Sequence, residues 1–158
     1  MPHSGTLTFP VSVVETWRAD PSAGHVEIVA AAIDAFNQRD FGAWEALSLA
    51  DVEVDWSASR GLEAGVYRGR AEVDRFLRTF ETFKSVVVEP EWLIDAGDSV
   101  IVTNSARFRG RAGIETVARS TVGYELHGGR IARVCLYQET ADALEAAGLR
   151  SRSASAFA

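Results

Sequence analysis

Cysteine is nearly absent from this sequence, which has Cys135 alone among its 158 residues. A lone cysteine excludes a disulfide within the chain and is typical of proteins in a reducing cytosol, so a cytoplasmic location is expected. Because Cys135 lies within the apolar segment 131–137, we interpret it as a small core residue rather than a reactive thiol.

Long hydrophobic runs and an excess of positive charge are also missing. No apolar run approaches the ~18 residues that span a bilayer, and the first residues lack the basic and apolar regions of a signal peptide, so neither a membrane partner nor secretion is expected. The formal net charge of −6 at pH 7 argues against a nucleic-acid partner, because phosphate binding needs clustered Lys and Arg. We interpret the basic cluster 107–111 as a solvated strand end.

Histidine is sparse as well. His3, His25 and His127 fall on a tail, a helix start and a turn, and this spacing makes no metal site. We therefore expect no metal and no other cofactor.

What is present indicates one globular domain. The hydrophobic fraction of 47% and the charged fraction of 24% are ordinary for a chain that buries its own core. We predict a domain over 23–150, an N-terminal extension over 1–22 and a disordered, small and polar tail over 151–158. Within the extension, 9–14 is interpreted as an added strand or as a cover over the open end of a pocket.

The clearest pattern is a run of strands from 85 to 138. Apolar and polar residues alternate through 99–109 and 115–126, which is typical of strands with one buried face. The Gly128-Gly129 pair predicts a tight hairpin turn into a last strand over 131–137. Strands of ten or more residues are long, so a twisted and curved sheet is expected.

Helical spacing dominates elsewhere. A first helix is predicted to start at 20–22 and end near 37–39, and Asp40 is predicted to cap a short second helix. A third helix is predicted over 69–83, with Val73, Phe76, Leu77, Phe80 and Phe83 on one face, and Thr140 is predicted to cap a short C-terminal helix that Gly148 ends. A strand over 51–56 and a long loop over 57–69 complete the prediction.

The order of these elements resembles the SnoaL-like branch of the nuclear transport factor 2-like superfamily. The likeness covers about 24–149 and is carried by the motifs at 36–40, 51–53, 63–69, 94–98 and 129–131. It implies an α+β fold in which a cone-shaped, curved, mixed or antiparallel sheet is covered by three helices on its concave face, plus a short C-terminal helix. The superfamily hosts isomerases, polyketide cyclases, epoxide hydrolases, dehydratases and non-catalytic binding modules, often as homodimers, so the fold alone names no activity.

Proton transfer in such a cavity needs an acid or base in an apolar wall. Asp55 and Glu63 are the candidate bases, although alternation places Asp55 opposite Val54 and Trp56. Glu63 lies on the loop expected to cover the pocket, with a surface position as the alternative. The candidate partners of a substrate oxygen are Arg107, Arg119 and Tyr137, and the alternative for either arginine is an ion pair on the outer face.

Aromatic side chains supply the candidate ligand contacts. Each ring is interpreted either as core filling or as part of a pocket wall, and the set with one amide is Trp56, Tyr67, Phe76, Trp92, Tyr124 and Gln138. The acid–arginine–acid set of limonene-type epoxide hydrolases would fall on Ser105, Arg107 and Leu136, so that chemistry is not implied.

Together these patterns favour a protein that binds a small, mostly apolar, carbonyl-bearing molecule. The expected chemistry is cofactor-free proton transfer of the isomerase, cyclase or dehydratase type. A non-catalytic small-molecule-binding or dimerisation module is the alternative.

Overall fold

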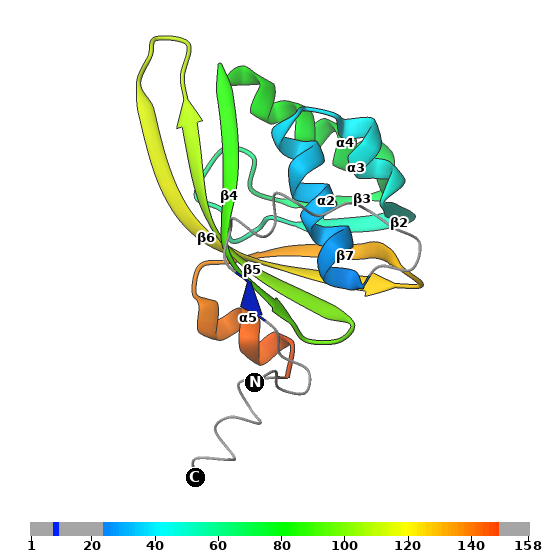
Figure 1. Ribbon diagram of the computed structural model, residues 1–158. Helices are drawn as coiled ribbons and strands as arrows, with labels where there is room; N and C mark the ends of the chain where they lie inside the picture. The colour runs from blue at the N-terminus through cyan, green and yellow to red at the C-terminus, as the bar shows by residue number, and fades with distance from the viewer. Residues whose placement is uncertain (1–7, 10–23, 149–158) are drawn as a thin grey trace.

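The computed structural model describes residues 8–9 and 24–148, and they form an α+β fold built on a curved sheet (Figure 1). The strand order is β1-β4-β5-β6-β7-β2-β3. The strands are β1 (Thr8–Phe9), β2 (Ser48–Asp55), β3 (Val66–Arg68), β4 (Ser85–Asp95), β5 (Ser99–Arg109), β6 (Glu115–His127) and β7 (Arg130–Tyr137). Apart from β1, the predicted terminal segments lie outside the described residues.

The sheet is mixed, as the fold prediction allowed. Strands β4 to β7 form an antiparallel meander, and β2 joins it by running parallel to β7. Strand β3 lies within the predicted loop 57–69, where it pairs with 53–55 of β2. It was missed because a strand of three residues is too short to show a recognisable apolar–polar alternation.

Three helices cover the concave face of the sheet, and a fourth lies on the other side (Figure 1). The covering helices are α2 (His25–Asn37), α3 (Phe41–Ala46) and α4 (Gly69–Thr79), with a 3-10 turn η1 (Phe80–Thr82) after α4, and the fourth is α5 (Thr140–Ala146). The predicted fold class is thus confirmed. No helix in the described ranges is both long and apolar enough to cross a membrane.

The helix ends follow their local chemistry. Asp40 caps α3 as predicted, because its side chain accepts a 3.1 Å hydrogen bond from the Ala43 N–H. The prediction that Thr140 caps α5 is wrong: Glu139 holds the cap position without a side-chain bond. The Thr140 hydroxyl instead lies 2.9 Å from the Thr121 hydroxyl, which ties α5 to β6.

Helix α4 ends earlier than its apolar stripe suggests. Val73, Phe76 and Leu77 are buried as predicted, and each such side chain contributes up to about 1.5–3 kcal/mol of gross burial free energy. The Thr79 hydroxyl donates to the Phe76 carbonyl at 2.6 Å, and the chain then tightens into η1. Phe83 therefore lies beyond the helix, where it packs on Phe108 at a ring-centre distance of 5.2 Å.

A bulge in β4 changes which side chains face inward. The register with β5 shifts between Pro90 and Trp92, so Glu91 is an extra residue in the strand. Before the bulge Val86, Val88 and Pro90 are at least partly buried, and after it Leu93 is fully buried. Trp92 is consequently on the outer face.

One amide fastens helix α2 to the sheet. Asn37 Nδ2 donates to the Val88 carbonyl and Asn37 Oδ1 accepts from the Val88 N–H, both at 2.8 Å. Within the described ranges β4 is an edge at this point, because β1 pairs only with Ile94 and Leu93. The side chain of Asn37 thus takes the place of a neighbouring strand for Val88.

Replacing Asn37 by Ala should lower the free energy of unfolding by about 2–3 kcal/mol, because two half-buried backbone groups lose their partners. Urea unfolding followed by circular dichroism measures the loss. Gln38→Ala is the matched control, since Gln38 is exposed and bonds only to Asp34 of its own helix, and it should stay within about 0.5 kcal/mol of the parent. Equal stability of Asn37→Ala and Gln38→Ala would contradict this account.

Candidate functional site

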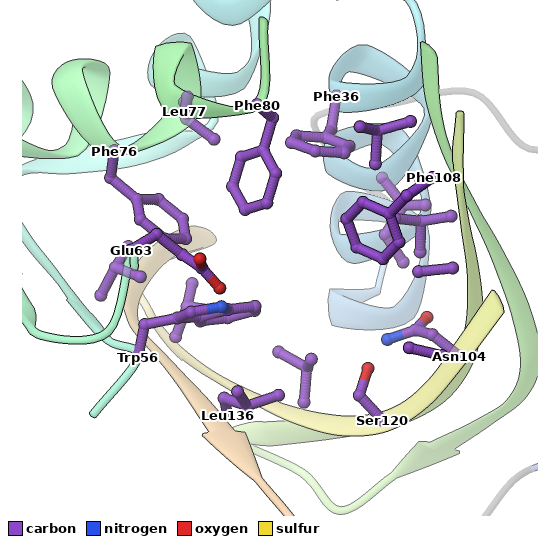
Figure 2. Close-up of a pocket in the computed structure, with 18 of the residues that line it drawn as sticks. Phe36, Trp56, Glu63, Phe76, Leu77, Phe80, Asn104, Phe108, Ser120 and Leu136 are labelled. Carbon is purple, nitrogen blue, oxygen red and sulfur yellow. The ribbon is translucent and has the colours of Figure 1, made fainter. Parts of the chain in front are cut away.

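A pocket of about 430 Å³ lies between the covering helices and the inner face of the sheet (Figure 2). Its wall is largely apolar and includes the aromatic rings of Phe36, Trp44, Trp56, Phe76, Phe80 and Phe108. It stays open because the inner faces of β5 and β6 carry small side chains there, namely Ala106, Ala118 and Ser120. A volume of this size accommodates a small organic molecule.

The loop 57–65 carries a carboxylate into this pocket. Figure 2 shows the Glu63 side chain pointing into the cavity from the loop wall. The Ser59 hydroxyl donates to Glu63 Oε2 at 2.6 Å, and the Tyr67 hydroxyl donates to the Glu63 carbonyl at 2.6 Å. Glu63 is the only carboxylate among the described residues that line the pocket.

Gly61 makes this conformation possible. A Cβ at position 61 would lie 2.3 Å from Glu63 Oε1, a distance that atoms do not tolerate. The carboxylate therefore folds back over the backbone of its own loop. The same loop is closed by a 2.8 Å hydrogen bond from the Trp56 N–H to the Gly65 carbonyl.

Trp56 lies below Glu63 with its indole nitrogen turned toward the cavity (Figure 2). Its ring packs against Phe76 at 5.2 Å between centres, which fixes the plane of the indole. Nε1–H of Trp56 has no hydrogen-bond partner among the described residues. A donor and a carboxylate thus face the same part of the pocket.

The sheet contributes a second polar group. Asn104 on β5 and Ser120 on β6 are directly opposite each other in the strand register, and both line the pocket. Asn104 is only 3% exposed, and its Oδ1 has no hydrogen-bond partner among the residues that the structure describes. Tyr124 lies four residues further along β6, and burial raises the pKa of its phenol, so the hydroxyl stays protonated at neutral pH.

A model of the SnoaL-like domain matches residues 29–134, well over half of the chain. The chain belongs to the SnoaL-like domain family. No curated protein matches it.

Solved structures share the fold of this SnoaL-like domain at low identity. TerC co-crystallised with polyporic acid is 20% identical with a TM-score of 0.64, over 82% of this chain and 99% of that one. A Mycobacterium tuberculosis protein in complex with estradiol-17beta-hemisuccinate is 16% identical with a TM-score of 0.66, over 77% and 96%. A Catenulispora acidiphila protein with a ketosteroid isomerase-like fold, in complex with trimethylamine, is 21% identical with a TM-score of 0.62, over 78% and 93%.

Within the SnoaL-like domain, Asp55 lies outside the pocket, on the face that alternation indicated. Its carboxylate accepts a 2.6 Å hydrogen bond from the Ser57 hydroxyl and pairs with Arg133 at 3.1 Å. The bond from Ser57 and the charge of Arg133 together hold the pKa of Asp55 below its usual value, against the opposing effect of partial burial. Asp55 is therefore a structural charge in this domain, and the candidate base that reaches the pocket is Glu63.

The candidate arginines also lie on the outer face of the SnoaL-like domain. Arg107 is half exposed, 3.5 Å from Glu89 and 3.9 Å from Glu115. Arg119 borders the pocket, but its guanidinium is paired with Glu91 on the outer side of the bulge. Each arginine thus forms an ion pair on the outer face, which is the alternative predicted for it from the sequence.

The aromatic candidates divide between the two faces. Trp56, Phe76 and Tyr124 line the pocket, whereas Tyr67 packs behind Phe76 at 4.9 Å between ring centres. The ring of Tyr137 lies across Gly123 on the outer face, and burial raises the pKa of Tyr137 to about 12. Trp92 is 53% exposed on that face, because of the bulge before it.

Gln138 lines the pocket. It also holds the loop 57–65 in place, since its Nε2 donates a hydrogen bond to the Ala58 carbonyl. Among the polar lining residues, sequence reasoning missed three: Arg60, Asn104 and Ser120. A signal existed for two of them, because Asn104 and Ser120 are polar residues at apolar positions of an alternating strand. Arg60 had no such signal, since it lies in a loop without periodicity.

Proposed function

We propose that this protein binds a small, mostly apolar molecule with a carbonyl group and moves a proton on it without a cofactor. The observation that carries the proposal is the Glu63 carboxylate, which Ser59 holds and which points into an aromatic pocket. A carboxylate in such surroundings is the group that proton abstraction next to a carbonyl requires.

The proposed step uses two neighbouring side chains. Glu63 removes a proton from the carbon next to the carbonyl, and the electron pair of that C–H bond forms a C=C bond while the carbonyl oxygen takes the negative charge. The Trp56 Nε1–H stabilises this enolate oxygen by hydrogen bonding. Protonated Glu63 then returns its proton to the same or another carbon, which completes an exchange or an isomerisation.

The fold relatives support the ligand part of this proposal. TerC was crystallised with polyporic acid and the Mycobacterium tuberculosis protein with estradiol-17beta-hemisuccinate. From these we take only the expectation of a small-molecule ligand, since the identities of 20% and 16% show the fold alone.

Deuterium exchange on 2-tetralone tests the proposal directly. In D₂O at pH 7, the protein should exchange the protons next to the carbonyl faster than buffer alone does, as followed by proton NMR. Saturable quenching of tryptophan fluorescence by 2-tetralone, without faster exchange, would reject the acid–base chemistry and support the non-catalytic binding module. Neither quenching nor exchange would reject the proposal as a whole.

We also propose a homodimer formed through the outer face of β4, β5 and β6. That face exposes Val87, Trp92 and Val117 by 37%, 53% and 55%. Around them arginines and glutamates alternate, as in the pairs of Arg107 with Glu89 and Glu115, so a second copy in a two-fold arrangement meets complementary charge.

Trp92→Glu should raise the dimer dissociation constant about 100-fold or more, because it replaces a central exposed ring by a charge. Size-exclusion chromatography with light scattering over a concentration series measures this. Leu62→Glu is the matched control, because Leu62 is fully exposed but lies on the loop 57–65 and not on these strands, so its variant should remain dimeric. A wild-type protein that stays monomeric at high concentration rules out the proposed dimer.

A further inference from the structure

Asn104 and Ser120 form a polar pair on a sheet side of the pocket that is otherwise mostly apolar. Around it on β5 and β6 lie Ala106, Phe108 and Val122. The two side chains are cross-strand neighbours, which places their Cβ atoms about 4.5–5.5 Å apart. They therefore reach the same point of the cavity, as Figure 2 shows.

Neither side chain has a partner within the described part of the chain. Asn104 Oδ1 is buried without a hydrogen bond, and neither Asn104 Nδ2 nor the Ser120 hydroxyl bonds to a described residue. Buried amides in folded proteins are nearly always paired, so an unpaired one in a pocket wall indicates a partner that arrives with the ligand.

The chemistry of the amide restricts what that partner is. An ether or carbonyl oxygen only accepts, and would leave Oδ1 unpaired. A carboxylate would lie against Oδ1 without a cation, since Arg119 is paired with Glu91 and Arg60 lies on the loop wall. A hydroxyl donates to Oδ1 and accepts from Nδ2 or Ser120, so it satisfies the amide in either of its two orientations.

We propose that Asn104, assisted by Ser120, is a specificity-determining residue that selects ligands with a hydroxyl group at the end that contacts the sheet. This inference rests on the proposed function, because it assumes that the pocket holds a small molecule. Figure 2 places Glu63 and Asn104 on opposite walls. The ligand class is therefore an elongated aromatic or alicyclic hydroxy-ketone, with its hydroxyl at Asn104 and its carbonyl near Glu63.

Fluorescence titration with 1-hydroxypyrene, 1-methoxypyrene and pyrene tests the selection. All three present the same flat apolar rings to the aromatic wall, but only 1-hydroxypyrene has a hydroxyl. The wild-type protein should bind 1-hydroxypyrene about 10- to 100-fold more tightly than the other two, as expected for a ligand that pairs a buried polar group. A matched pair of 2-decalol and decalin, competed against pyrene, distinguishes alcohols from phenols as the preferred source of the hydroxyl.

Asn104→Leu should abolish this preference to within about twofold while pyrene binding persists, because the new side chain keeps the volume but has no acceptor. Ser120→Ala should reduce the preference for 1-hydroxypyrene in part. If Asn104→Leu does not fold, the preference measured for Ser120→Ala decides whether this pair selects the hydroxyl. Ser105→Ala, on the outer face of the same strand, is the control that should behave like the wild type.

Each outcome separates the two proposals. Equal binding of the three pyrenes by the wild type, or a full preference retained in both Asn104→Leu and Ser120→Ala, overturns the role of Asn104 and leaves the apolar pocket intact. Hydroxyl selection without exchange on 2-tetralone supports the role of Asn104 and rejects the chemistry assigned to Glu63. No binding of any pyrene overturns both.

Discussion

Glu63→Gln is expected to slow proton exchange on 2-tetralone by about 10²- to 10⁴-fold, the usual contribution of a positioned general base. The amide has nearly the shape of the carboxylate, and the Ser59 hydroxyl can still donate to its oxygen, so the loop should keep its conformation. Binding of 2-tetralone, followed by tryptophan quenching, should change by less than about threefold, because the ketone contacts mainly the aromatic wall. The loss thus falls on turnover and not on affinity.

Glu89→Gln is the matched control for this variant. Glu89 makes the same change from carboxylate to amide, but it lies on the outer face beside Arg107 and is not among the pocket-lining residues. Its exchange rate should equal that of the wild type. A Glu63→Gln protein that exchanges at the wild-type rate would show that another group, or none, acts as the base.

Arg133→Met should lower the free energy of unfolding at pH 7 by about 2–4 kcal/mol. Arg133 pairs with three carboxylates: Nε lies 3.1 Å from Glu53, Nη2 3.1 Å from Asp55 and Nη1 3.4 Å from Glu125. Its side chain is 33% exposed, so the expected loss is smaller than that for a fully buried pair. Without the guanidinium, three negative charges, two on β2 and one on β6, repel one another.

The pH dependence of this loss has a definite sign. In the folded wild type the pKa of Asp55 is lowered, chiefly by the hydrogen bond from Ser57 and further by Arg133. A lowered pKa contributes stability that is present above the unfolded value of ~3.8 and lost as the pH falls through the folded value. In Arg133→Met the Asp55 carboxylate loses the positive charge that helps to lower its pKa, so the deficit relative to the wild type should be largest above about pH 5 and shrink toward pH 3.

Arg107→Met provides the comparison at an exposed site. Arg107 also contacts two glutamates on the outer face, but it is half exposed and its distances are 3.5 and 3.9 Å. Its loss should stay below about 1 kcal/mol. Urea unfolding of both variants at pH 3, 5 and 7 measures the difference, and equal losses at pH 7 would refute the special role of Arg133.

Alternation of apolar and polar residues was enough to predict the sheet. One local irregularity, the bulge in β4, made the predicted direction of the side chain that follows it wrong. From Val86, Val88 and Pro90, a period of two assigns Trp92 to the pocket face. The bulge at Glu91 reverses that assignment. Pro90 indicates an edge or an irregularity in this strand, but it does not tell which residue is the extra one. Trp92 therefore lies on the outer face although its sequence position favoured the pocket.

The polar residues of the site illustrate a different limit. Asn104 and Ser120 interrupt the apolar side of two alternating strands, so their position in the wall was available from the sequence. That they are opposite each other depends on the register between β5 and β6, which is a long-range property. Glu63 was a candidate through its loop, but its direction depends on Gly61 and Ser59, two contacts that no periodicity encodes.

Almost all the contacts that fix the position of Glu63 come from residues close to it in the sequence. Ser59, Gly61 and Tyr67 lie within four residues of it, and the segment joins the remainder of the protein through the bonds of Trp56 to Gly65 and of Gln138 to Ala58. The proposed base is thus carried by a short loop whose two ends are fixed. A different nine-residue insert could give the same scaffold a different reaction, or none, with the helices and sheet unaltered.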